Sequence, residues 1–156
     1  MHDGFSLPQT SWIALLSIAH RYEFLNVRER AIREIYCISL LHPGSSLPSP
    51  AHLHLWQDHV LLISVGEKYD VPLRYMLLSL VALVWRGEPL SADEVALFSA
   101  LTVSQLARAR EDYARRTVNL PPEHVGWTNK ATEHLTWSYG VARNLVCKIW
   151  AIPNDD

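Results

Sequence analysis

The sequence predicts an all-α fold in which antiparallel helix pairs form one helical bundle or a short solenoid-like domain. Apolar residues recur three and four positions apart along most of the chain, which is the spacing of one helix face. Capping-box signatures mark helix starts, and a segment of about 47 residues is weakly repeated. No stretch alternates between apolar and polar residues in the way that predicts hairpin strands.

Length and composition favour one domain with a well-filled core. A chain of 156 residues buries about two thirds of the surface that its unfolded form exposes. The charged fraction of 19% is below the roughly 25% of typical soluble domains, which favours a large core or a surface meant for a partner. The net charge of −2 gives no positive field for phosphate backbones, so nucleic-acid binding is disfavoured.

Cysteine usage and the N-terminus indicate where the protein resides. Cys37 and Cys147 are each set in an apolar helical pattern and are predicted to be buried free thiols, as in a reducing compartment. The N-terminal residues lack the basic start and apolar centre of a signal peptide. We therefore expect an intracellular protein, cytoplasmic or nuclear.

The first predicted helix pair follows an N-terminal tail of residues 1–10. Ser11 is a suitable N-cap for the first helix. One face of that helix is apolar and comprises Trp12, Leu15, Leu16, Ala19 and Tyr22. Asn26 and Glu29 have the spacing of a second helix start after a very short turn. The apolar stripe of the second helix comprises Val27, Ala31, Ile35 and Ile38.

A second helix pair is predicted after a loop rich in proline and serine, residues 42–57. Asp58 can cap its first helix, and Pro72 suits the first turn of its second helix. The uncharged run of that second helix, residues 75–85, is far shorter than the roughly 20 residues that span a bilayer, so we expect no membrane segment. Because the run is apolar on all sides, it predicts a central helix packed by neighbours on more than one face.

The two helix pairs resemble each other in sequence. Tyr22 aligns with Tyr69, and Phe24 aligns with Val71. A repeat of this length with a helix, turn, helix plan is typical of stacks in which each pair buries its apolar stripe against the next.

The rest of the chain predicts a joint, a third helix pair and a long last helix. Gly87 and Pro89 end the central helix, and Ser91 with Glu94 forms a capping box that begins a short helix with Val95 and Phe98 inward. A second capping box, Thr102 with Gln105, predicts a longer helix with Val103, Leu106, Ala107 and Tyr113 on its inner side. After Pro121 and Pro122, the last helix has an apolar stripe of Leu135, Tyr139, Ala142, Val146 and Ile149.

Histidines are the only candidates for a metal site. His52, His54 and His59 have spacings at which imidazoles can converge on zinc, but two of them stand in the predicted loop without a cysteine or acidic partner in a known pattern. We therefore predict no metal site and no cofactor, with these three as weak candidates. His20 and His134 lie near aromatic and acidic residues, yet no nucleophile or nucleotide motif accompanies them. The sequence thus predicts no catalytic residues, and the protein is expected not to be an enzyme.

Arginines and tryptophans are the remaining candidates for recognition. The arginines at positions 28, 30, 33, 108, 110, 115 and 116 are interleaved with acidic residues, which is typical of solvated, ion-paired helix faces. A helix-turn-helix DNA reader is the alternative interpretation of the short-turn helix pairs. Among the six tryptophans, Trp56 in the loop and Trp127 after the prolines are candidates for a partner-binding surface.

Residues 11–111 resemble the helical region that follows the BTB/POZ domain in the large fungal group of BTB-domain proteins. The resemblance rests on three pieces in order, "SWIALLSIAHRYEFLNVRERAIREI", "GEKYDVP" and "LVWRGEPLSADE", and ends at "ARE". In the third piece Leu83, Arg86, Pro89, Leu90 and Glu94 match the pattern of the family. The BTB domain itself does not precede Trp12 in this sequence, the family's tryptophan is absent near Tyr75, and the match beyond Arg115 is weak.

The resemblance implies a BACK-like helical domain over residues 11–118 and a C-terminal extension over residues 119–156. It also implies protein–protein interaction, by analogy with adaptors that carry substrates to cullin-type ubiquitin ligases or act in nuclear complexes. We therefore expect a non-catalytic interaction or scaffold module with protein partners. A small helical DNA-associated regulator is the second interpretation, and an enzyme is the third.

Overall fold

The computed structural model describes residues 7–36, 56–117 and 130–153, and over these ranges it is all-helical, with seven helices and no strand. In order these are α1 (Gln9–Arg21), α2 (Leu25–Tyr36), α3 (Trp56–Lys68), α4 (Leu73–Trp85), α5 (Ala92–Val95), α6 (Ala100–Thr117) and α7 (Lys130–Trp150). The prediction of an all-α fold is confirmed for this part of the chain.

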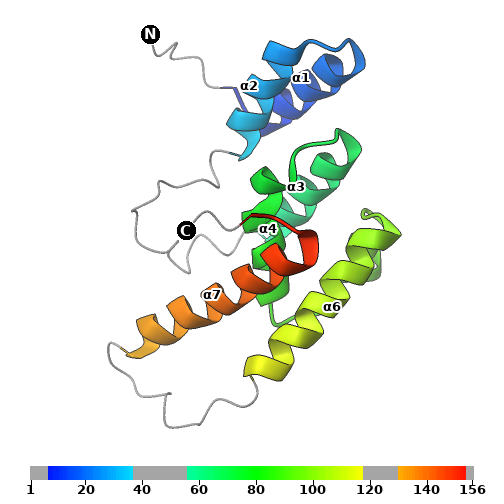
Figure 1. Cartoon of the computed structure of the whole chain (residues 1–156). Coiled ribbons are helices and arrows are strands. Elements are labelled where there is room, and N and C mark those ends of the chain that lie inside the picture. The colour runs from blue at the N-terminus through cyan, green and yellow to red at the C-terminus, as the bar shows by residue number, and fades with distance from the viewer. Residues whose placement is uncertain (1–6, 37–55, 118–129, 154–156) are drawn as a thin grey trace.

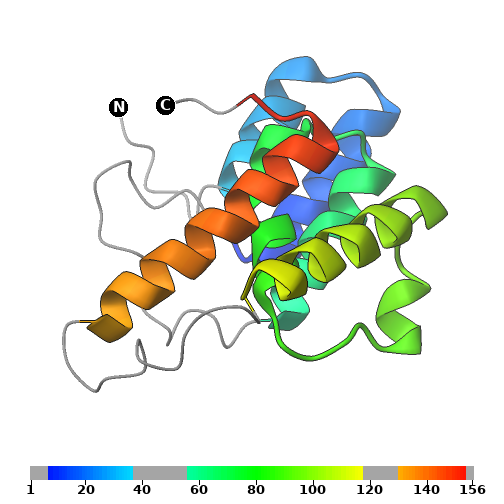
Figure 2. The ribbon, with the colours of Figure 1, turned by 60° about the horizontal axis from the view of Figure 1, so that its bottom comes forward.

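Helix α4 lies at the centre of the molecule (Figures 1 and 2). It packs against α3, α6 and α7 and touches α2, whereas α1 packs mainly against α2. Seven of its residues are buried: Met76, Ser79, Leu80, Val81, Ala82, Leu83 and Val84. Burial on every side explains why the sequence of this helix is apolar all round, and the prediction of a central helix is confirmed. None of the described helices has the length and apolarity to cross a membrane.

A buried arginine organises the joint between α4 and α5. The Arg86 guanidinium donates two hydrogen bonds of 2.7 Å to the two carboxylate oxygens of Glu94, and two more, of 3.2 and 3.0 Å, to the carbonyls of Glu88 and Pro89. Only 6% of its side chain is exposed. The two hydrogen bonds from Arg86 to the carboxylate are the main cause that lowers the pKa of Glu94 to about 2. The joint is therefore held closed by one charged pair.

The capping box predicted at this joint is confirmed and is part of the same network. The Glu94 N–H donates to Ser91 Oγ at 3.2 Å, and the Ser91 N–H donates to Glu94 Oε2 at 2.7 Å. Arg110 on α6 adds hydrogen bonds to the carbonyls of Leu83 and Glu88, at 2.9 and 2.5 Å. Since Glu88 accepts from both arginines, the network ties the end of α4 to α6.

The first three helices begin earlier than their sequence signals predict. Helix α1 is preceded by Pro8 and not by Ser11, and α3 begins at Trp56, two residues before the cap predicted at Asp58. Helix α2 begins at Leu25, so that the predicted cap Asn26 lies inside it. These differences are small, and helix ends are less sharply defined than helix interiors.

The inward face of the region after the joint also differs from the prediction. Helix α6 begins at Ala100, three residues before the start that a cap at Thr102 predicts, and Thr102 is buried. Leu106 is buried as predicted, but Ala109 is buried in place of Ala107. Phe98, which follows the end of the short helix α5, is buried as predicted, whereas Val95 is 37% exposed. Helix α6 packs against α7 and α4.

The sequence repeat corresponds to a repeated helix ending. In α1 the N–H of Phe24 donates to the carbonyl of Ala19, and in α3 the N–H of Val71 donates to the carbonyl of Gly66, both at 2.9 Å. The residue before each donor, Glu23 or Asp70, is left-handed, with φ of 58° and 50°. These are the features of a Schellman ending. The aligned residues thus occupy the same places in the same turn.

Gly66 permits a close approach between α3 and α4. A Cβ atom at this position would overlap the thioether of Met76 and lie 3.1 Å from the Tyr36 hydroxyl. Met76 is only 4% exposed, so its side chain has little free space into which to move. The Tyr36 hydroxyl is fixed by donating to the carbonyl of Leu62 at 2.7 Å.

We expect Gly66→Ala to lower the free energy of unfolding by about 1–3 kcal/mol, because overpacking forces Met76 from its place. Urea denaturation measures the change. Gly87→Ala is the matched control, since nothing lies within 4 Å of the added atom and the backbone there is not left-handed. Gly87→Ala should change the free energy of unfolding only slightly. Equal effects of the two substitutions would contradict the close approach at Gly66.

Candidate functional site

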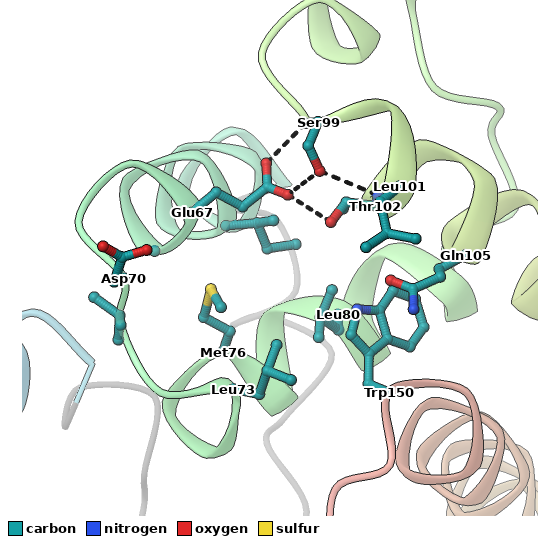
Figure 3. A pocket seen from close by; sticks show the side chains of 13 residues that line it. Glu67, Asp70, Leu73, Met76, Leu80, Ser99, Leu101, Thr102, Gln105 and Trp150 are labelled. Carbon is teal, nitrogen blue, oxygen red and sulfur yellow. Dashed lines mark hydrogen bonds between the residues drawn. The ribbon is translucent and has the colours of Figure 1, made fainter.

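A pocket of about 290 Å³ lies where α3, α4, α6 and the end of α7 meet (Figure 3). Its only charged lining residues are Glu67 and Asp70, at the end of α3. The remaining lining residues are Ile63, Gly66, Val71, Leu73, Met76, Leu80, Ser99, Leu101, Thr102, Gln105 and Trp150. A hollow with mostly apolar walls and a few polar groups on one side is the usual form of a binding site.

The Glu67 carboxylate caps the start of α6 from across the pocket. Its Oε2 accepts from the N–H of Ser99 at 2.9 Å, and its Oε1 accepts from the hydroxyls of Ser99 and Thr102 at 2.6 and 2.5 Å (Figure 3). Ser99 Oγ in turn accepts from the N–H of Thr102 at 3.2 Å. An acid 32 residues away thus does what the glutamate of a capping box does locally. The Glu67 carboxylate therefore has a structural role.

The apolar wall of the pocket is well placed to receive an apolar side chain. Met76, Leu80 and Trp150 are buried residues that face it, at 4%, 1% and 7% exposure. Leu73 and Leu101 line the same space but are themselves 38% and 68% exposed. Burial of an apolar side chain of a ligand here would remove apolar surface from water on both sides of the contact.

A second candidate surface is the turn between α1 and α2. Large apolar side chains in this region are 41–69% exposed: Ile18, Tyr22, Phe24, Leu25 and Val27. The rings of Tyr22 and Phe24 stack with their centroids 6.0 Å apart. The predictions that Tyr22 and Val27 face inward are wrong. Tyr22 follows the last residue of α1, where the left-handed Glu23 turns the chain away from the core.

Two arginines that the sequence places on ion-paired faces instead bind backbone carbonyls. Arg28 donates to the carbonyls of Tyr69 and Asp70 at 3.0 and 2.7 Å, at the end of α3. Arg110 binds carbonyls at the end of α4, and its burial lowers its pKa. Arg115 behaves as predicted and pairs with Glu111 at 2.6 Å. Cationic side chains at C-terminal helix ends complement the exposed carbonyls and the helix dipole.

Most of the predicted site residues lie outside the described part of the chain. His52, His54 and Trp127 fall there, and so does the side chain of Trp56, the first residue of α3. Nδ1 of His59 lies 3.3 Å from Ser79 Oγ. Over the described residues, no three metal-ligating side chains come together.

Several titratable groups of the core are shifted toward their neutral forms. Burial raises the pKa of the Tyr36, Tyr113 and Tyr139 hydroxyls and of the Cys147 thiol. The ring of His20, near the end of α1, lies edge-on to the ring of Tyr69, with the two ring centroids 5.7 Å apart. These groups pack the interior and are not gathered around the pocket.

No family model, no curated protein and no solved structure matches the chain.

Proposed function

We propose that this chain is a non-catalytic protein–protein interaction or scaffold module. The observation that supports this best is the exposed apolar surface of the α1–α2 turn, residues 18–27. Five large apolar side chains within ten residues remain open to water there. Isolated apolar side chains on a surface are ordinary, but several in one short segment are typical of a surface that a partner covers. Aromatic residues such as Tyr22 and Phe24 are enriched in such contacts.

The resemblance to the helical region that follows the BTB domain in fungal proteins supports the same proposal. The residues that carry the resemblance include both aromatic residues of the turn and Arg86 and Glu94 of the joint. The corresponding architecture is a stack of antiparallel helix pairs, in which α1–α2 and α3–α4 are successive units. By analogy, the module acts as an adaptor, with a link to cullin-type ligases as one form of it.

The pocket between α3, α4, α6 and α7 gives this module a second contact point. Its size and apolar wall suit one side chain of a partner, held between the exposed leucines Leu73 and Leu101. A scaffold needs more than one contact surface, and the pocket and the turn lie on different elements.

We expect a protein partner captured by the wild-type chain to be lost with Phe24→Ser and retained with Leu97→Ser. Both residues are 54% exposed, so both variants should fold, and only Phe24 belongs to the turn. Affinity capture from extracts of the source organism, followed by mass spectrometry, measures this. Circular dichroism checks that the variants are folded. Salt-sensitive retention of DNA, or a partner held equally by both variants, would contradict the proposal.

A further inference from the structure

We infer that the pocket between α3, α4, α6 and α7 binds a basic side chain, lysine or arginine, that a protein partner presents. This inference rests on the proposed function and names the chemistry of the partner at that contact point. It follows from a combination of two features. The wall of the pocket is mostly apolar, and every charged side chain among its described lining residues is acidic.

The apolar wall suits the hydrocarbon stem of a basic residue. Buried side chains of Met76, Leu80 and Trp150 form this wall, and the exposed side chains of Leu73 and Leu101 line the same space. Lysine and arginine bury their methylene stems along apolar surface while the charged head stays in contact with water. A volume of about 290 Å³ is at the lower end of ligand pockets, which suits one side chain better than a larger ligand.

Two carboxylates lie on one side of the pocket, and they have different partners. Glu67 accepts three hydrogen bonds from Ser99 and Thr102 as the cap of α6. Asp70 is exposed and lies on the same side as Glu67, away from Trp150 (Figure 3). Within the described part of the chain, no ion pair or hydrogen bond reaches the carboxylate of Asp70. Asp70 is therefore available to pair with a cation.

The basic residues of this chain that surround the turn are placed elsewhere. Arg28 donates to the carbonyl oxygen of Asp70 and not to its carboxylate. Lys68 and Arg74 lie over the tyrosine rings that follow them in the sequence, 5.5 and 5.0 Å from the ring centroids. None of these three side chains lines the pocket. The charge of Arg28 offsets part of the charge of Asp70, so the preference for a cation is expected to be modest.

The backbone adds to the negative character of the pocket. Helix α3 ends at Lys68 and α7 ends at Trp150, and both ends border the pocket. The C-terminal end of a helix carries a partial negative charge, which favours a nearby cation. The start of α6 carries the opposite partial charge, but Glu67 already caps it. Side chains and backbone thus both favour a basic side chain over an acidic one.

The test uses the full ¹⁵N-labelled chain and four capped tripeptides. Each peptide has leucine at both ends and lysine, arginine, acetyl-lysine or glutamate in the middle. We expect the two basic peptides to shift the amide signals of residues 66–71 and the indole N–H signal of Trp150. They should bind about three- to tenfold more tightly than the acetyl-lysine peptide, because a partly exposed charge pair contributes modestly. The glutamate peptide should bind most weakly.

Asp70→Asn should remove this preference, and Asp93→Asn on α5 is its matched control. Both replace an exposed aspartate by its amide, but only Asp70 lines the pocket. Asparagine suits the left-handed backbone at position 70, so the variant should keep the turn. Leu73→Ser should weaken the four peptides by a similar factor and leave the preference unchanged, since it removes only apolar contact.

Equal binding of the basic and acetyl-lysine peptides, or a preference that Asp70→Asn retains, would overturn the inference. Binding of n-butylamine as tight as that of the lysine peptide would also overturn it, because the pocket would then serve a free amine. So would a dimer of this chain that Asp70→Asn dissociates in analytical ultracentrifugation, because a second copy would then supply the basic residue. If the peptides fail but Phe24→Ser still loses a captured partner, the proposed function stands and only this mode of docking fails.

Discussion

Leu83→Asp is expected to leave the chain unfolded at neutral pH. Leu83 is fully buried in the central helix α4, so the substitution places a carboxylate among apolar side chains and removes a large part of their packing. The two effects together cost about 5 kcal/mol or more, which is comparable with the whole stability of an ordinary domain. Circular dichroism and urea denaturation measure the result.

Glu88→Ala is the control for this prediction. The carbonyl of Glu88 accepts hydrogen bonds from Arg86 and Arg110, but its exposed side chain makes no hydrogen bond in the described structure. Since alanine keeps the carbonyl, stability should change little. A soluble and fully folded Leu83→Asp protein would show that α4 is not the centre of the core.

The sequence was sufficient to predict the elements that depend on periodicity and local chemistry. The apolar run of α4 predicted its central place because only a helix covered on every side needs such a run. The capping box of Ser91 and Glu94 predicted the joint because both of its hydrogen bonds are local. Helix starts that depend on distant residues were missed. Glu67, 32 residues before Ser99, selects the start of α6, and no local pattern contains that contact.

The candidate surfaces were harder to predict for a related reason. Periodicity placed Tyr22 in the core because it continues the stripe of α1, but it cannot tell that α1 ends at Arg21 and that the left-handed Glu23 then turns the chain. The pocket combines Glu67, Leu73, Thr102 and Trp150 from four helices, and none of these residues stands out in its own segment. One signal was present: the alignment of Tyr22 with Tyr69 indicated two equivalent turns, and the structure shows that only one of them is covered.

Arg86→Ala is expected to lower the free energy of unfolding by about 3–5 kcal/mol, because it leaves Glu94 without its partner in a largely buried pair. It also leaves the carbonyls of Glu88 and Pro89 without these donors. Arg86→Lys should restore only part of the loss, since one ammonium group cannot reproduce the two parallel hydrogen bonds to Glu94. Urea denaturation at neutral pH compares the three proteins. Glu111→Gln, in the exposed pair with Arg115, should cost less than about 0.5 kcal/mol.

The buried pair of Arg86 and Glu94 also predicts how the stability of the protein depends on pH. The pKa of Glu94 is about 2 in the folded chain and 4.5 ordinarily, so protons bind more tightly to the unfolded chain. The stabilisation from this group is therefore complete above about pH 4.5 and is lost as the pH falls toward 2. We expect a loss of about 1–2 kcal/mol, less than the full shift implies, because solvent screens a carboxylate whose side chain is 22% exposed. Glu94→Gln lacks the titrating group, so the difference in stability between wild type and this variant should shrink over that range. A constant difference from pH 5 to pH 2.5 would mean that the pair stabilises the joint through packing rather than charge.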